Sequence, residues 1–143
     1  MFRLAIAATL FAVWSLASAQ ATNLGQLKAQ NAVQVSADEM QQLIPGAKVV
    51  SLTIAGSTRR WTNKSDGTLS ASSDGRGSTG GRGYASSAQG TWMLDEKGRW
   101  CVKIQWTGAL DDWCRYLFKS GEKYYGFGRL DDSAVGSEFE LSH

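Results

Sequence analysis

Hydrophobic and polar positions alternate along most of the chain after residue 47, and this period of two predicts β-strands. The segment 98–128 predicts three consecutive strands and holds both cysteines and three of the six tryptophans. Further strands are predicted at 49–54, 59–62, 68–72 and 90–94, with Glu138 to Leu141 as a last edge strand. About seven or eight short strands with turns between them indicate a mainly β fold, either an antiparallel meander or a small β-barrel.

One helix is predicted ahead of the strands. Ser36-Ala37-Asp38-Glu39 matches the S-x-x-E capping box, in which Ser36 covers a free amide and Glu39 reaches back to the start of the helix. Apolar residues follow at helical spacing, and Pro45-Gly46 ends the helix after about eight residues. Residues 20–35 are polar and lack a firm period, so we expect a flexible leader there.

The first 19 residues have the pattern of a signal peptide. Arg3 is followed by an apolar run over residues 4–16 and by the small residues Ala17-Ser18-Ala19. That run is shorter than the roughly 20 residues that a membrane-spanning helix needs. We therefore expect a periplasmic or secreted protein without a membrane span, and a single β-rich domain over residues 36–143.

The charge balance does not indicate a nucleic-acid partner. The chain has 15 basic and 13 acidic residues, and removal of the signal peptide takes away only Arg3. A nucleic-acid-binding domain is usually strongly basic on one face. We expect a monomer.

Two cysteines in an exported chain most simply form one disulfide, Cys101 to Cys114, with two free thiols as the alternative. If these residues face each other across antiparallel strands, Val102 opposes Trp113 and Trp100 opposes Arg115. Alternation then places Trp100, Val102, Ile104, Trp106, Trp113 and Leu117 on the core face. Arg99 opposes Tyr116, a cation beside an aromatic ring.

Residues 73–83 are dominated by Gly, Ser and Thr, which predicts a loop. Within them, residues 75–80 match G-x-G-x-x-G, but no buried strand precedes the motif and no helix can follow it, so a dinucleotide site is not expected. A weaker possibility is an anion held by backbone amides together with Arg76 and Arg82.

The sequence predicts no catalytic residue, no metal site and no cofactor. The only histidine is His143 at the C-terminus, so a Ser-His or Cys-His arrangement is not available. The acidic pairs Asp111-Asp112 and Asp131-Asp132 are interpreted as solvated turn residues rather than as calcium ligands or glycosidase carboxylates.

Large aromatic side chains are numerous, and most are expected in the core. A few could instead line one sheet face and stack on a sugar or a peptide. The best candidates for exposed aromatic residues are Trp61, which lies near Arg59, and Tyr84, which follows the Gly-rich segment.

The order of these motifs resembles a known family. The chain resembles small exported proteobacterial proteins catalogued as domain of unknown function 995. The resemblance lies in the helix start Ser36-Ala37-Asp38-Glu39, Leu43 to Gly46, Gly90 to Trp92, Cys101, Trp113-Cys114 and Lys119-Ser120-Gly121-x-x-Tyr124. The resemblance implies an exported β-rich domain with paired cysteines and no established catalytic residue. Ser120-Gly121-x-x-Tyr124 is also similar to a loop of periplasmic lysozyme inhibitors, although the cysteine spacing differs.

The sequence thus predicts an exported, non-catalytic binding module of the cell envelope that recognises a protein partner or a glycan. One alternative is an inhibitor of lysozyme or of another cell-wall hydrolase, acting through Ser120 and Tyr124. A second alternative is a small hydrolase that depends on carboxylates. The candidate ligand-binding residues are Arg59, Trp61, Arg76, Arg82, Tyr84, Ser120 and Tyr124.

Overall fold

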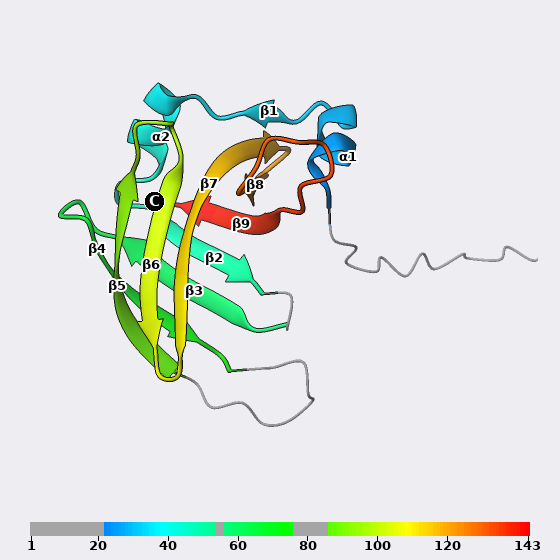
Figure 1. Ribbon diagram of the computed structural model, residues 1–143. Helices are drawn as coiled ribbons and strands as arrows, with labels where there is room; N and C mark the ends of the chain where they lie inside the picture. The colour runs from blue at the N-terminus through cyan, green and yellow to red at the C-terminus, as the bar shows by residue number, and fades with distance from the viewer. Residues whose placement is uncertain (1–21, 54–55, 76–85) are drawn as a thin grey trace, which may run out of the picture.

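The computed structural model describes residues 22–53, 56–75 and 86–143. These ranges contain two helices and nine strands (Figure 1). The helices are α1 (Leu24–Ala29) and α2 (Ala37–Leu43), and neither is long and apolar enough to cross a membrane. The strands are β1 (Val33–Gln34), β2 (Lys48–Leu52), β3 (Thr58–Asn63), β4 (Thr68–Ser73), β5 (Ser86–Leu94), β6 (Trp100–Trp106), β7 (Ala109–Ser120), β8 (Lys123–Phe127) and β9 (Ser137–Ser142).

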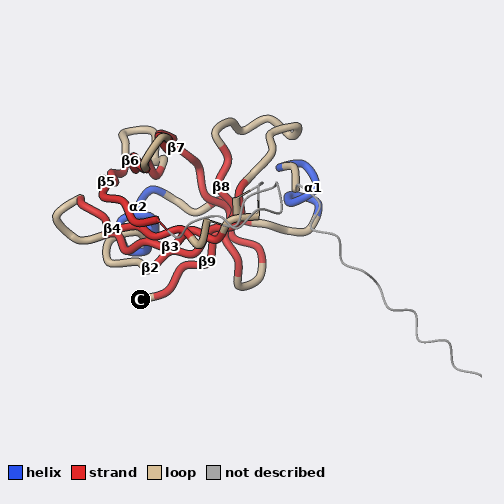
Figure 2. Tube along the Cα trace, turned by 90° about the horizontal axis from the view of Figure 1, so that it is seen from below, coloured by secondary structure: helices blue, strands red, loops and turns tan. Residues whose placement is uncertain are grey.

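Strands β2 to β9 form a closed antiparallel barrel of eight strands. Each strand pairs with the next along the chain, and β9 returns to pair with β2. Seen from below, the strands surround the interior and α1 lies outside their ring (Figure 2). The expectation of a last edge strand is therefore wrong, because β9 has a partner on each side and closes the barrel.

The hairpin of β6 and β7 has the predicted register. Cys101 and Cys114 are bonded to each other and pair across the two strands, with Cα atoms 4.0 Å apart. Val102 pairs with Trp113, and Trp100 pairs with Arg115. The predicted cation–aromatic contact is also confirmed, since the Arg99 guanidinium carbon lies 5.9 Å from the centroid of the Tyr116 ring.

Four aromatic rings form the centre of the barrel core. Trp61, Trp100, Trp113 and Phe139 come from four strands, and every pair of their ring centroids lies within 6.5 Å. Trp100 and Phe139 are fully buried. Aromatic pairs at this spacing stabilise a core beyond their buried area alone, so this cluster holds opposite walls of the barrel together.

Helix α2 covers one end of the barrel. It begins with the predicted capping box, in which Ser36 and Glu39 satisfy each other's backbone amides at 3.2 and 2.8 Å. Met40 and Ile44 are buried in the barrel core. Asn63, which is fully buried on β3, accepts a hydrogen bond from the Trp61 indole and donates one to the Ile44 carbonyl, so it joins this end cover to the wall.

A second helix, α1, lies where a flexible leader was expected, and that expectation is wrong for residues 22–35. Asn23 and Gln26 form a capping box, and Leu24 and Leu27 are buried. With Phe118, Phe127 and Ala134 they form a second core on the outer face of the barrel. The apolar outer face of β7 and β8 needs a cover, and the short helix provides it. The predicted signal peptide lies outside the described residues.

Candidate functional site

Strand β7 pairs with its two barrel neighbours along different parts of its length. On one side it pairs with β6 over residues 109–115, whereas on the other side β8 reaches only residues 116–120. The chain bends away from β7 after Phe127, the partner of Tyr116. Residues 109–115 therefore form a free strand edge within the described part of an otherwise closed barrel wall.

A cavity of about 360 Å³ lies between this part of β7 and strands β2, β3 and β9. We call it the slot. Its apolar walls include Trp61, Trp113 and Phe139 from the central aromatic cluster. Its full lining is Ser51, Leu52, Thr53, Ser57, Arg59, Trp61, Ile104, Asp111, Trp113, Arg115, Ser137 and Phe139. An eight-stranded barrel has room inside for side chains or for one small ligand. The volume of the slot is large enough for a small ligand.

Three charged residues line the slot, and two of them neutralise each other. The Arg59 guanidinium forms an ion pair with the Asp111 carboxylate, and both side chains are about three-quarters buried. The Trp106 indole donates a second hydrogen bond to the same carboxylate oxygen at 2.8 Å. Arg59 also lies over the Trp106 ring, 5.1 Å from its centroid. Asp111 is thus held in place and its charge is compensated.

The third charged residue, Arg115, has no carboxylate at ion-pair distance among the described residues. Its guanidinium carbon lies 4.4 Å from the centroid of the Trp113 ring and 5.7 Å from that of Phe139. Burial lowers the pKa of Arg115, and the nearby charge of Asp111 opposes this effect. An arginine stays protonated in proteins all the same, so the slot lining carries one uncompensated positive charge.

Gly126 of β8 provides the space that Arg115 occupies. A Cβ atom at residue 126 would lie 2.9 Å from the Arg115 Cδ atom and 2.8 Å from the Phe139 ring. These separations are shorter than normal van der Waals contacts, so only glycine leaves both side chains where they are. The position of the unpaired cation therefore depends on a glycine of the neighbouring strand.

The structure brings two of the predicted ligand-binding residues together, but not as expected. Arg59 and Trp61 both line the slot. Trp61 is only 5% exposed, so the expectation of an exposed stacking platform is wrong for this residue. Alternation along β3 turns Arg59, Trp61 and Asn63 inward and leaves Arg60 outside. Arg76, Arg82 and Tyr84 lie outside the described residues.

The other two predicted residues, Ser120 and Tyr124, belong to the β7–β8 hairpin. Tyr124 lines a separate groove of about 400 Å³ beside β1 and α2, together with Lys119, Glu39 and His143. The Lys119 ammonium lies 5.6 Å from the centroid of the Tyr124 ring. The groove and the slot share no lining residue, so Tyr124 lies apart from Arg59 and Trp61 on the barrel.

Sequence reasoning missed Asp111 and Arg115 as site residues. Asp111 was interpreted as a solvated turn acid, and this is wrong because it lies inside β7 with its carboxylate in the slot. The signal was available in the predicted register. Trp113 was placed on the core face, and in a strand the residues two positions before and after it, Asp111 and Arg115, share that face.

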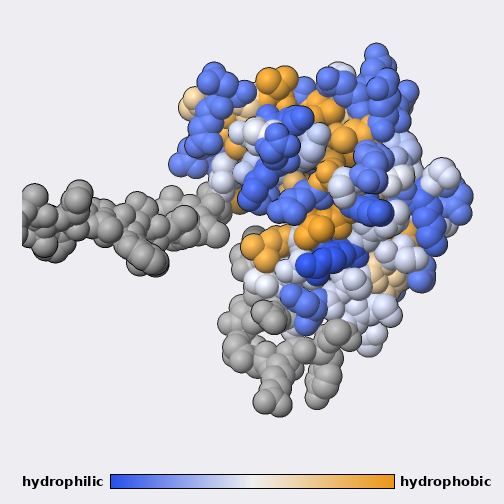
Figure 3. Space-filling model, turned by 180° about the vertical axis from the view of Figure 1, so that it is seen from behind, coloured by the Kyte–Doolittle hydropathy of each residue, from blue (hydrophilic) through white to orange (hydrophobic). Residues whose placement is uncertain are grey.

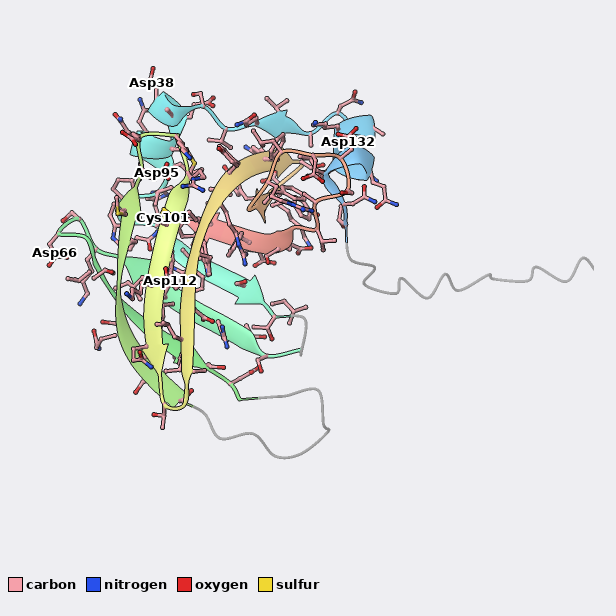
Figure 4. The ribbon with its side chains drawn as sticks, in the orientation of Figure 1. Asp38, Asp66, Asp95, Cys101, Asp112 and Asp132 are labelled. Atoms are coloured by element: carbon pink, nitrogen blue, oxygen red, sulfur yellow. A yellow bond between two sulfur atoms is a disulfide. The ribbon has the colours of Figure 1, made fainter. Side chains whose placement is uncertain are left out.

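Asp95, Cys101 and Cys114 form the one group of three potential metal ligands found among the described residues. Figure 4 shows Asp95 and Cys101 near the same end of the hairpin. The two sulfur atoms are bonded to each other, and the Asp95 carboxylate forms an ion pair with Arg99 at 2.7 Å. A thiolate is the form of cysteine that binds metal, and the disulfide has none. In the oxidised protein these residues therefore stabilise the fold through the disulfide and the ion pair.

A family comparison agrees with the resemblance of the sequence motifs. The family model described as "Protein of unknown function (DUF995)" matches residues 10–112. The chain belongs to this family. The matched part of this DUF995 protein includes Arg59, Asp111 and Cys101 and ends before Cys114 and Arg115. The comparisons with curated proteins and with solved structures found no match.

Proposed function

We propose that this protein is an exported, non-catalytic binding protein whose slot takes a ligand with a negatively charged group. The observation that carries the proposal is the uncompensated guanidinium of Arg115 in a cavity wall. A buried or half-buried charge is unfavourable unless a partner compensates it, and a carboxylate of the ligand supplies that partner. Arginine is well suited to this role because its planar donors match a carboxylate in pairs.

The remaining lining of the slot indicates the chemical character of the rest of the ligand. The indole rings of Trp61 and Trp113, with Phe139, offer an apolar surface beside the cation. Ser51 and Ser137 add hydroxyl groups to the lining. Binding sites commonly combine apolar walls with a few polar groups that fix the orientation of the ligand. We therefore expect a carboxylate attached to an apolar or aromatic body.

Binding without catalysis is supported by the chemistry of the lining. Asp111 is the one carboxylate in the slot, and Arg59 and Trp106 already occupy one of its oxygen atoms. Hydrolysis by carboxylates generally needs a second acidic group on the other side of the bond. Export is supported by the disulfide, which is typical of oxidising compartments. We therefore expect the binding partner in the cell envelope.

Phenylacetate and phenylacetamide form a matched pair of probes for this proposal. They differ in charge but have nearly the same shape. Isothermal titration, or quenching of the tryptophan emission, should show that phenylacetate binds the wild-type protein and that the amide binds at least about ten-fold more weakly. The Arg115→Met variant should lose the preference for the carboxylate.

Arg60→Met is the matched control, because Arg60 is exposed on the outer face of β3. This variant should keep the wild-type affinity and preference. Equal affinity for the acid and the amide in the wild-type protein would contradict the proposal. An unchanged preference in Arg115→Met would contradict it as well.

A further inference from the structure

The free edge of β7 lies directly beside the slot, and it offers backbone groups as well as side chains. The hairpin of β6 and β7 turns through two residues, 107 and 108. In such a hairpin the residues next to the turn form a hydrogen-bonded pair, and the bonding pattern then alternates along the strands. Asp111, Trp113 and Arg115 therefore direct their backbone groups toward β6.

Three observations support this assignment. The Cα atoms of Cys101 and Cys114 are only 4.0 Å apart, as expected for a pair without ladder hydrogen bonds. The Val35 amide donates to the Leu117 carbonyl at 2.8 Å, so the odd-numbered residues of β7 face the side of β6 and β1. The β7–β8 hairpin also turns through two residues, which makes Ser120 and its even-numbered neighbours face β8.

Leu110, Asp112 and Cys114 consequently direct their amide and carbonyl groups toward the free edge. Figure 4 shows Asp112 on the part of β7 below the segment that β8 covers. No other described strand pairs with this edge. The side chains of Leu110 and Asp112 are exposed, so an incoming chain can reach their backbone groups. On the face seen from behind, a band of hydrophobic side chains is bordered by hydrophilic ones (Figure 3).

We propose that the ligand of the slot is an extended polypeptide segment that adds to the β7 edge as a new strand and places an acidic side chain against Arg115. This inference rests on the proposed function and names its ligand class. Hydrogen bonds to Leu110, Asp112 and Cys114 hold the backbone of the segment, as in other cases of strand addition. Arg115, which points into the slot from the same strand, selects the acidic residue.

Charge complementarity favours a segment with an acidic side chain over a neutral segment. The three charged residues of the slot leave one positive charge beside the edge. Successive side chains of an added strand alternate between the two faces, so one acidic side chain in the segment points inward while its neighbours stay in solvent. A free edge with an adjacent binding pocket combines backbone affinity with side-chain specificity.

The probe is an acetylated, amidated hexapeptide with one central glutamate between valines and threonines. Its comparison compound is a single glutamate capped as the acetyl methylamide, which has the carboxylate but cannot form a strand. The hexapeptide should bind the wild-type protein at least about ten-fold more tightly than the capped glutamate. Arg115→Met should weaken both.

Asp112→Pro tests the edge itself, because proline removes an amide that faces away from β6 and leaves the ladder with β6 intact. The extra affinity of the hexapeptide should disappear in this variant and persist in Asp112→Ala, which keeps the amide. A hexapeptide N-methylated at alternate amides makes the same test on the wild-type protein and does not depend on how Asp112→Pro folds.

The outcomes separate the two proposals. If the hexapeptide binds no better than the capped glutamate while both depend on Arg115, strand addition is wrong and the anion site stands. If the extra affinity survives both Asp112→Pro and N-methylation, strand addition is also wrong. If neither compound depends on Arg115, both proposals fail.

Discussion

The Arg115 guanidinium lies over the Trp113 ring on the inner wall of the barrel, with its central carbon 4.4 Å from the ring centroid. The two residues are neighbours on one face of β7, so the strand itself fixes this contact. A cation held against an aromatic face keeps a favourable partner while its donors remain available for an anion. This arrangement leads to predictions for the site and for the fold.

Removal of the cation should not weaken the fold. We expect Arg115→Met to keep the free energy of unfolding or to raise it by about 1 kcal/mol, because methionine fills the space without the cost of burying an unpaired charge. Urea denaturation followed by tryptophan emission measures this. A loss of more than about 2 kcal/mol would show that Arg115 is a structural residue of the core.

Gly126→Ala should disturb the site from the neighbouring strand. The added Cβ atom meets Arg115 and the Phe139 ring at less than 3 Å, so both side chains must move. We expect a loss of about 1–3 kcal/mol in stability and weaker binding of phenylacetate. Gly128→Ala is the matched control, since nothing lies within 4 Å of a Cβ atom there. Wild-type binding by Gly126→Ala would contradict the prediction.

The disulfide should contribute a large part of the net stability. Cys101 and Cys114 close a short loop, with a sequence separation of 13. The chain-entropy estimate for a loop of this size is about 3 kcal/mol. Replacement of both cysteines by alanine should lower the free energy of unfolding by that amount in urea denaturation. A change below about 1 kcal/mol would mean that the hairpin does not need the link.

Helix α1 should stabilise the barrel rather than extend loosely from it. Leu27 is 1% exposed in the outer core, and its truncation to alanine should cost about 2–5 kcal/mol. Lys28→Ala, on the exposed side of the same helix, should cost less than about 0.5 kcal/mol, because its ion pair with Asp132 is exposed. Similar stabilities of the two variants would indicate that α1 is not docked.

Asp95 should make the stability depend on acid pH. Burial opposes its ionisation, but hydrogen bonds from the amide and the side chain of Arg99, with the charge of Arg99, outweigh burial and lower its pKa. Its contribution is therefore complete above the unfolded pKa of about 3.9 and disappears as pH falls through the folded pKa. The stability difference between wild type and Asp95→Asn should shrink below about pH 4; a constant difference would contradict this.

Local patterns in the sequence predicted the central hairpin and α2 well. The pairing of Cys101 with Cys114 sets the register of β6 and β7, and alternation then assigns the core face. The Ser36 to Glu39 capping box depends on residues three apart in the chain. Both features arise from contacts that short stretches of sequence contain.

Other features depend on contacts between distant segments. Helix α1 has only six residues, and it is stable because Leu24 and Leu27 meet Phe118 and Phe127, which are about a hundred positions away. The free edge of β7 exists because β8 stops at Phe127, and barrel closure by β9 decides which residues face inward. Because this closure depends on distant segments, Trp61 was expected on the outside of the barrel, whereas it lies inside.

The most direct test of the central claim is the side-chain resonance of Arg115 in solution. In a titration with phenylacetate, the Nε–H signal of Arg115 should shift progressively and saturate, while that of Arg60 on the outer face stays in place. Phenylacetamide at the same concentrations should shift the Arg115 signal much less and leave the Arg60 signal in place. An Arg115 signal that does not move with phenylacetate, or that moves equally with the amide, would contradict the anion site.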